Sequence, residues 1–202
     1  MTNSAKVVAS RDIKFYHTPY SSTNVLPADT VTWDQAWGTP AGQAAAWVDA
    51  GFTQGGPTFS AEIARAEIRM DQSLDPVLRP ATGRTVTMGA QLGEFDLDTL
   101  TTATGQGSVA TLAATTAARG YDEWSMGSTV ADNFYSAAID VLHGGDDEAI
   151  RLVLWYAQPT GAQQWTFAPE TPALTPFLLT ALPDPSNGNR VATIRDLTPI
   201  AA

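Results

Sequence analysis

The chain of 202 residues contains no cysteine, only two lysines and only two histidines. Without cysteine, thiolate metal sites, disulfide bonds and a small disulfide-stabilised fold are excluded. His17 and His143 stand alone, outside any His-Glu-x-x-His pattern, and two isolated histidines make a poor metal site. Neither a Gly-x-Ser-x-Gly sequence nor a glycine-rich phosphate loop occurs. The sequence therefore predicts no catalytic residue, no metal and no cofactor, and we expect a protein that is not an enzyme.

Positive charge and long apolar runs are also scarce. The formal net charge is -10, and the nine arginines are scattered along the chain, which disfavours tight binding of nucleic acid through phosphates. The first fifteen residues lack the apolar core of a signal peptide, and no apolar run reaches membrane-spanning length. We therefore expect a soluble protein that is made inside the cell and has no membrane partner.

Two long stretches with a period of two stand out. In the first, Ala64, Ala66, Ile68 and Met70 alternate with Arg65, Glu67, Arg69 and Asp71. In the second, Val86, Met88, Ala90 and Leu92 alternate with Thr85, Thr87, Gly89, Gln91 and Gly93. Alternation of this length predicts two strands with one face on a core and the other in water. The wet face is long and free of large apolar groups, as in a strand that lines an aqueous lumen.

A loop and a helix accompany these strands. The loop, Gln72 to Gly83, contains two prolines, is too long for a tight hairpin and carries apolar side chains that suggest docking on something, or folding back over its own core. After the second strand, Asp96 is a good N-cap for a short helix, and Gly105 is a good C-terminal stop.

The rest of the chain predicts further strands within a single domain, 1–202, that is mainly β. Residues 1–24 show little periodicity and are expected to form an extended N-terminal arm or a frayed terminus. Residues 53–57 (TQGGP) are expected to form a turn, and 107–120 a flexible connection or a weak strand. The other expected strands cover residues 45–52, 121–126, 133–143, 149–157, 165–168, 173–182 and 190–194.

The sequence also offers two chemical alternatives. Asp71 and Asp75, or the cluster Asp146, Asp147 and Glu148, could act in glycoside hydrolysis or bind calcium, but acidic residues are also what turns favour. The six tryptophans could form a platform for sugar stacking, although scattered tryptophans in strands more often pack a core or a subunit interface.

The order of these features resembles that of the major tail tube proteins of long-tailed, siphovirus-type bacteriophages, particularly those of actinobacteriophages. Three segments carry the resemblance: WVDAGFTQGGPTFS (47–60), EIRMDQSLDPVLRPATGRTVTMGAQLGEFDLDTLTTATG (67–105) and ALTPFLLTALPDPSNG (173–188). The resemblance lies in the ordered combination of strand, long loop, strand and capped helix, because there is no catalytic signature to match.

The resemblance implies a β-sandwich-like tail tube fold with one short flanking helix, assembled as stacked hexameric rings whose strands join a multi-subunit inner barrel. It implies a structural virion protein of the tail, assembled in the host cytoplasm, that forms the conduit for DNA ejection. Implied partners are further copies of the chain, the tape measure protein, the tail terminator and the distal tail proteins, while double-stranded DNA passes without specific binding. The implied lumen-lining residues are Arg65, Glu67, Arg69, Asp71, Thr85, Thr87 and Gln91, and the implied inter-subunit, ring-stacking loop contains Leu74, Asp75, Val77, Leu78 and Arg79.

Size is consistent with such a conduit. About 24 strands, spaced about 4.8 Å apart and tilted by roughly 45°, close at a backbone radius of roughly 26 Å, which leaves a lumen roughly 40 Å wide. A B-form duplex, roughly 20 Å across, would pass without being gripped. Two other functions stay open: a non-catalytic β-sandwich binding module (carbohydrate-binding, or a virion decoration protein) and, with only generic carboxylates behind it, an acidic hydrolase.

Overall fold

The structure is a computed structural model that describes residues 10–26, 37–43, 45–69, 75, 77–93, 96–115, 119–127, 130, 132–143, 149–167, 169–170 and 172–197. It is mainly β, with one short helix. In chain order the elements are β1 (Ser10–Pro19), β2 (Val48–Asp49), β3 (Thr53–Arg65), β4 (Ala81–Leu92), α1 (Leu97–Thr104), β5 (Ser108–Leu112), β6 (Tyr121–Ser125), β7 (Tyr135–His143), β8 (Ala149–Pro159), β9 (Thr175–Ala181) and β10 (Ala192–Leu197).

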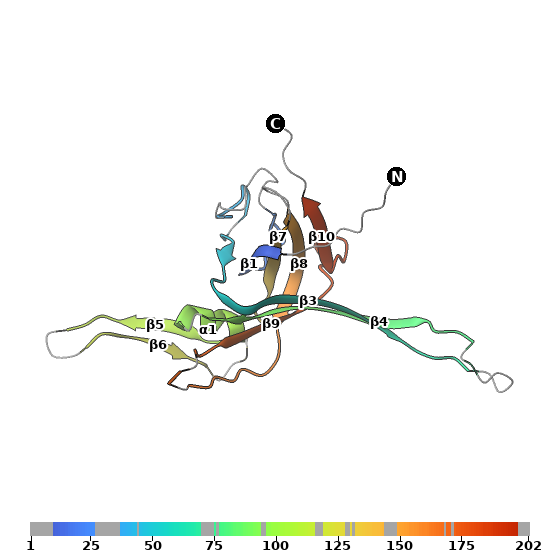
Figure 1. Cartoon of the computed structure of the whole chain (residues 1–202). Coiled ribbons are helices and arrows are strands. Elements are labelled where there is room, and N and C mark those ends of the chain that lie inside the picture. The colour runs from blue at the N-terminus through green and yellow to red at the C-terminus, as the bar shows by residue number, and fades with distance from the viewer. Residues whose placement is uncertain are drawn as a thin grey trace.

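A single antiparallel sheet folds over itself into a sandwich-like body because β8 changes its partner along its length. Its first half, Ala149 to Leu154, pairs with β10, and its last residues, Ala157 to Pro159, pair with β9. The upper layer therefore contains β2, β1, β7, β8 and β10, while β9, β4 and β3 form a lower layer that runs across it (Figure 1). A strand that passes from one layer to the other in this way forms the corner of the sandwich.

The main core lies between the two layers. Phe15, Ile139 and Leu154 come from the upper layer and pack against Met88 and other side chains of β4 and β9. These side chains are among the most buried in the described chain. The expected inward set on the second long strand, Val86, Met88, Ala90 and Leu92, is buried, so this prediction of alternation is confirmed.

The upper layer is buried on its other face as well. There Tyr16, Trp37, Trp47 and Trp155 form a second cluster, with the ring centroids of Tyr16 and Trp37 4.2 Å apart. Core packing of tryptophan is thus confirmed for Trp37, Trp47 and Trp155, whereas Trp33 lies outside the described residues.

Both ends of the helix follow the sequence prediction. The Asp96 side chain accepts a hydrogen bond of 2.6 Å from the backbone N–H of Thr99, which satisfies one of the free donors of the first turn. Gly105 ends the helix in the left-handed region, at φ 64°. Leu100 and Ala103 are buried and anchor the helix to the body of the protein.

Several expected boundaries are wrong. The extended arm over 1–24 is wrong for residues 10–19, which form β1 between β7 and β2. Both faces of β1 are covered, so its sequence shows no polar alternation. The expected turn 53–57 belongs to β3, where Gly55 and Gly56 have φ near 75° and absorb a shift in the pairing with β4. Only β2 forms within 45–52, and 165–167, the described part of the expected strand 165–168, is not a strand.

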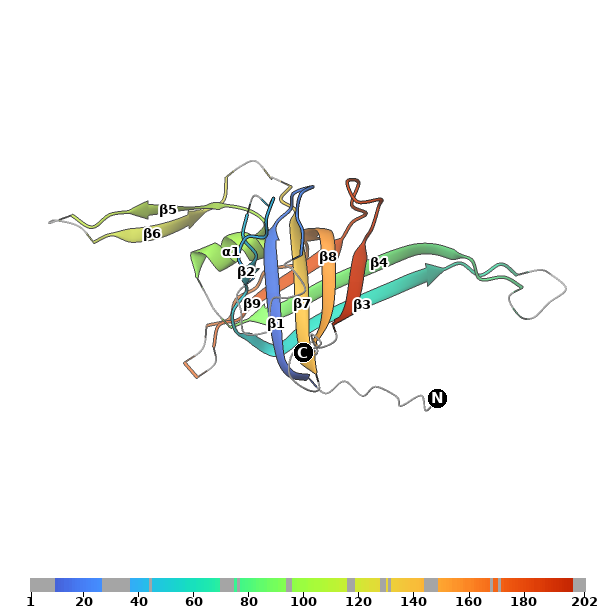
Figure 2. The same ribbon diagram turned by 90° about the horizontal axis from the view of Figure 1, so that it is seen from above.

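Two hairpins extend beyond the body in opposite directions. The β3–β4 hairpin reaches out past the upper layer, and the β5–β6 hairpin leaves from the side of α1 (Figures 1 and 2). β5 and β6 pair only with each other in the described chain. β5 is therefore the weak strand that was one of the two expectations for residues 107–120.

An ion pair is buried in the upper layer. Arg151 donates to both carboxylate oxygens of Asp140, at 2.7 and 2.8 Å, and its guanidinium lies 4.3 Å from the ring centroid of Trp37. Burial raises the pKa of Asp140, and the neighbouring Arg151 opposes this shift. Two buried charges in contact are tolerated together, whereas either one alone is costly.

We expect Asp140→Val to reduce the free energy of unfolding by about 3–5 kcal/mol, because it leaves the buried Arg151 charge without its partner. The double variant Asp140→Val/Arg151→Met should recover much of this loss. Urea denaturation of the two variants and the wild-type protein measures the difference. Equal destabilisation of the single and double variants would show that the unpaired charge is not the cause.

Candidate assembly surface

The strand β3 has one open edge. It stands at the end of the strand order and, within the described chain, hydrogen-bonds along its 13 residues to β4 alone. The other edge presents unpaired backbone donors and acceptors over a length that in an isolated protein invites pairing with another chain. This edge is the most extended unsatisfied feature of the lower layer.

On β3 and β4, the face of the lower layer that points away from the core is polar and nearly uncharged, while β9 adds Leu178, which is 38% exposed, to the same face. The ladder places Ser60 opposite Thr87, which on its other side pairs with Thr180 of β9. Next along the hairpin, Glu62 lies opposite Thr85. Paired residues share a face of the sheet, so a band of hydroxyl groups crosses all three strands with Glu62 at its side.

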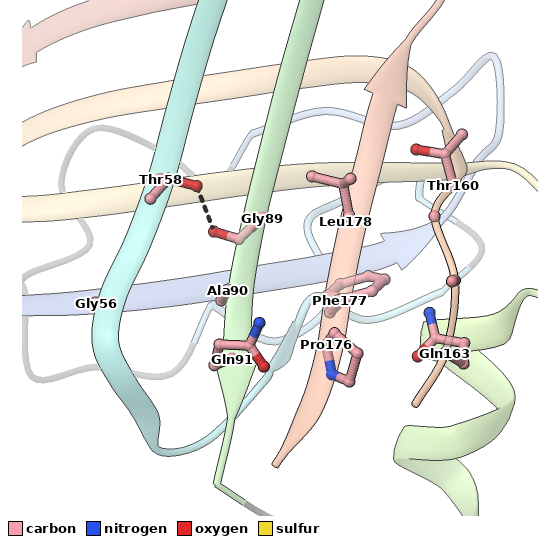
Figure 3. A pocket seen from close by; sticks show the side chains of 12 residues that line it. Gly56, Thr58, Gly89, Ala90, Gln91, Thr160, Gln163, Pro176, Phe177 and Leu178 are labelled. Atoms are coloured by element: carbon pink, nitrogen blue, oxygen red, sulfur yellow. Dashed lines mark hydrogen bonds between the residues drawn. The ribbon is translucent and has the colours of Figure 1, made fainter. Parts of the chain in front are cut away.

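A shallow depression of about 310 Å³ interrupts this outer face (Figure 3). Thr58, Gln91, Thr160 and Gln163 contribute its polar groups, and the Thr58 hydroxyl donates to the carbonyl oxygen of Gly89 at 3.2 Å. The lining contains no charged, histidine or cysteine residue. Such a site offers hydrogen bonds and contact area.

A glycine keeps the floor of the depression flat. A Cβ atom at position 89 would lie 2.9 Å from Cδ1 of Leu178 and 3.0 Å from the carbonyl oxygen of Phe177. Any other residue there would push β9 away from β4 or displace Leu178. The close approach of β4 and β9 therefore depends on Gly89.

The outer part of the β3–β4 hairpin is held by polar contacts around Glu67. Its carboxylate accepts from Arg69 at 3.0 Å and from Arg79 at 2.8 Å, and Arg65 donates to the carbonyl oxygen of Arg79 at 3.2 Å. A backbone bridge between Ile68 and Leu78 joins the same two segments. Exposed ion pairs contribute little, under about 1 kcal/mol each, so these contacts set the local shape more than the stability.

Some of the expected site residues are arranged differently from the prediction. Thr85, Thr87 and Gln91 do lie on the face opposite the buried side chains of β4. However, the partners of Thr85 and Thr87 on β3 are Glu62 and Ser60. Arg65 lies on the other face of β3, together with Ile63. The expectation that Arg65 shares the polar face is therefore wrong. The expected alternation placed Ala64 on the core side of β3, whereas the ladder places Ile63 there, and a shift of one residue exchanges the two faces.

The remaining expected positions lie at the outer end of the hairpin. Glu67 and Arg69 follow the end of β3 and form ion pairs with neighbours instead of continuing its ladder. Ile68 was expected to pack on the core but is exposed. The loop residues Asp75, Val77, Leu78 and Arg79 are exposed, while Asp71 and Leu74 lie outside the described residues, as do Met70, Asp146, Asp147 and Glu148.

No group of three or more acidic, histidine or cysteine residues in the described ranges could hold a metal ion. Burial lowers the pKa of His17 to about 4, so this side chain is neutral at neutral pH, where it packs edge-on against Tyr135 and Phe177. Within the part of the chain that the structure covers, no helix is long and apolar enough to cross a membrane.

The comparisons add no relative: the sequence matches no protein-family model and no curated protein sequence. Function is therefore inferred from the residues and their geometry.

Two neighbouring substitutions on β4 should have opposite outcomes. We expect Val86→Lys to prevent folding, because the Val86 side chain is 4% exposed and the lysine charge would be buried without a partner. In contrast, Thr87→Lys should fold, since Thr87 lies on the hydroxyl band and a lysine stem there can reach water. Circular dichroism and urea unfolding of both variants test this, and equal tolerance at positions 86 and 87 would contradict the assignment of the two faces.

Proposed function

We propose that this chain is a structural subunit that polymerises into a tube, in the manner of the tail tube proteins that its sequence resembles. Copies of the chain form hexameric rings that stack, and the lower layers join into one inner barrel. The tube is the conduit through which DNA leaves a bacteriophage, and it belongs to the tail of the virion. The proposed contacts at the ends and inside of the tube are the terminator, distal tail and tape measure proteins.

The observation that carries this proposal is the open edge of β3. A strand of 13 residues with one unpaired edge is a liability in a monomer, and pairing with the lower layer of a neighbouring copy satisfies it. A ring of such contacts is heterologous, with different surfaces meeting at each interface, and it closes when the rotation between copies permits.

The polar outer face supports a role as the wall of a DNA conduit. Between Thr58 and Ala64 on β3, and between Gly83 and Gln91 on β4, the residues of this face include no lysine or arginine. Nucleic acid is gripped mainly through contacts between cationic side chains and phosphates. A wall of hydroxyl and amide groups with one glutamate lets a duplex slide.

The alternative, a carbohydrate-binding or decoration module, has weaker support. A sugar platform needs aromatic side chains on an accessible face, whereas Trp37, Trp47 and Trp155 are buried in the upper layer. The depression on the outer face is lined by threonine, glutamine, glycine and apolar residues, and the only aromatic residue in its lining is the buried Phe177.

Purified wild-type protein should form hollow tubes or six-fold rings that are visible by negative-stain electron microscopy. We expect Val77→Asp/Leu78→Asp to give a folded protein that forms tubes poorly, because both side chains are more than half exposed at the outer end of the hairpin and mark an interface. Val25→Asp is the matched control, since Val25 is an exposed apolar residue in the segment after β1. Tubes of normal length from the double variant would show that this end of the hairpin makes no contact between copies.

The absence of cysteine allows the lumen to be located directly. In variants with one introduced cysteine, Gln91→Cys should react with a bulky maleimide polymer in the monomer but be protected in assembled tubes. Ile194→Cys, on the exposed part of β10 in the upper layer, should react in both states. Labelling of Gln91→Cys in intact tubes at the rate seen for the monomer would place this face on the outside.

A further inference from the structure

The core-facing side of the β3–β4 hairpin continues beyond the core that it helps to build. Along this side the ladder places Phe59 with Met88, Ala61 with Val86 and Ile63 with Arg84. Met88 is fully buried and Val86 is 4% exposed, yet Ile63 is 52% exposed. The covering upper layer ends before the hairpin does (Figure 1), so the same face passes from a packed core to a bare apolar surface.

We call the bare part the hairpin face. It consists of Ile63 on β3, its partner Arg84 on β4, and Arg65, which lies two residues after Ile63 and on the same side of β3. Ile68, Val77 and Leu78, farther out on the same hairpin, are also exposed. Exposed apolar groups in this number mark a surface that another protein surface covers. The two charged residues of the hairpin face, Arg65 and Arg84, are both exposed and both positively charged.

The β5–β6 hairpin carries a matching surface on the opposite side of the molecule. Its pairing places Leu112 with Tyr121, and Ala110 with Glu123, on one face. Leu112 and Tyr121 are more than half exposed. On the other face, Val109 and Trp124 are half-buried, and Trp124 lies against Gly107 at the base of the hairpin. A hairpin of two five-residue strands is marginally stable alone, so cover on the exposed face would stabilise it.

The charges of the two surfaces are complementary. Glu123 shares the face of Leu112 and Tyr121 and is exposed, whereas its neighbour Asp122 pairs with Thr111 on the other face. Arg119, before β6, is the one described basic residue of that hairpin. Arg65 and Arg84 flank Ile63 on the other hairpin. The two hairpins point in opposite directions in both views, so one molecule cannot bring them together (Figures 1 and 2). A second copy placed head to tail can.

We infer that the β5–β6 hairpin of one copy covers the hairpin face of the next, with Leu112 and Tyr121 on Ile63 and with Glu123 near Arg65 and Arg84. This inference rests on the proposed function and names the surfaces that join its subunits. The contact is heterologous, because a different hairpin of each copy takes part, and it therefore propagates from copy to copy.

Reversal of charge on each side tests the pairing. Arg65→Glu/Arg84→Glu makes the hairpin face acidic, and Glu123→Lys makes the contact face of the β5–β6 hairpin basic. Each variant alone opposes like charges at every contact, so we expect its critical concentration for assembly to rise about tenfold. An equimolar mixture of the two variants restores opposite charges at both kinds of contact, and it should assemble with the two proteins alternating. Light scattering and negative-stain microscopy measure both effects.

The control variant Arg190→Glu/Arg195→Glu changes the net charge by the same amount near and on β10, and it should assemble like the wild-type protein alone. Raised salt should weaken the difference between the mixture and its separate components. If each swapped variant assembles normally by itself, or if the mixture fails while the wild-type protein forms tubes, the pairing of these surfaces is wrong and the tube function stands. A wild-type protein that stays monomeric at all concentrations overturns both.

Discussion

The division of β8 between two partners is the constraint on which the rest of the structure depends. Its early residues are hydrogen-bonded to β10 and its last three to β9, so one strand belongs to both layers. The inward side chains of the two layers can then face each other, and Leu154 meets Met88 in a dry core. The lower layer is attached at the β9 side, which leaves β3 at the far side as an open edge. The proposed assembly surface is thus a direct product of where the sheet folds over.

The parts of the fold that could be predicted are those where one face is dry and the other wet. Val86, Met88 and Leu92 alternate with small polar residues, and they are buried as the pattern indicates. Asp96 and Gly105 mark the helix ends because each satisfies free backbone groups there. The Asp96 side chain accepts from the N–H of Thr99, and Gly105 adopts the left-handed conformation in which its N–H reaches the carbonyl oxygen of Thr102. Such local chemistry is visible in the sequence without knowledge of the rest of the chain.

The parts that could not be predicted depend on distant partners. β1 is covered by aromatic side chains on one face and by the main core on the other, so its sequence has no contrast between the faces. Gly55 and Gly56 have the composition of a turn but serve a bulge, and only the pairing with β4 distinguishes the two. The alternation that begins at Ala64 does not predict the position of Arg65, because it is one residue out of phase with the β3 ladder. The apolar series Phe59, Ala61 and Ile63 is the sequence signal that could have corrected it.

The geometry of the two projecting hairpins also determines how the protein responds to force. The two hairpins extend in opposite directions, away from a body whose upper strands run across the lower layer (Figure 1). In the β3–β4 ladder, ten residue pairs from Thr53 to Arg65 lie along the direction of that hairpin. Tension applied at its tip pulls the paired strands β3 and β4 outward together and slides β4 along β9, so the backbone hydrogen bonds of the β4–β9 ladder resist together instead of opening one after another. Copies connected end to end through these hairpins would behave as a cable of short, stiff segments, whose weakest links lie at the junctions and not within the subunits.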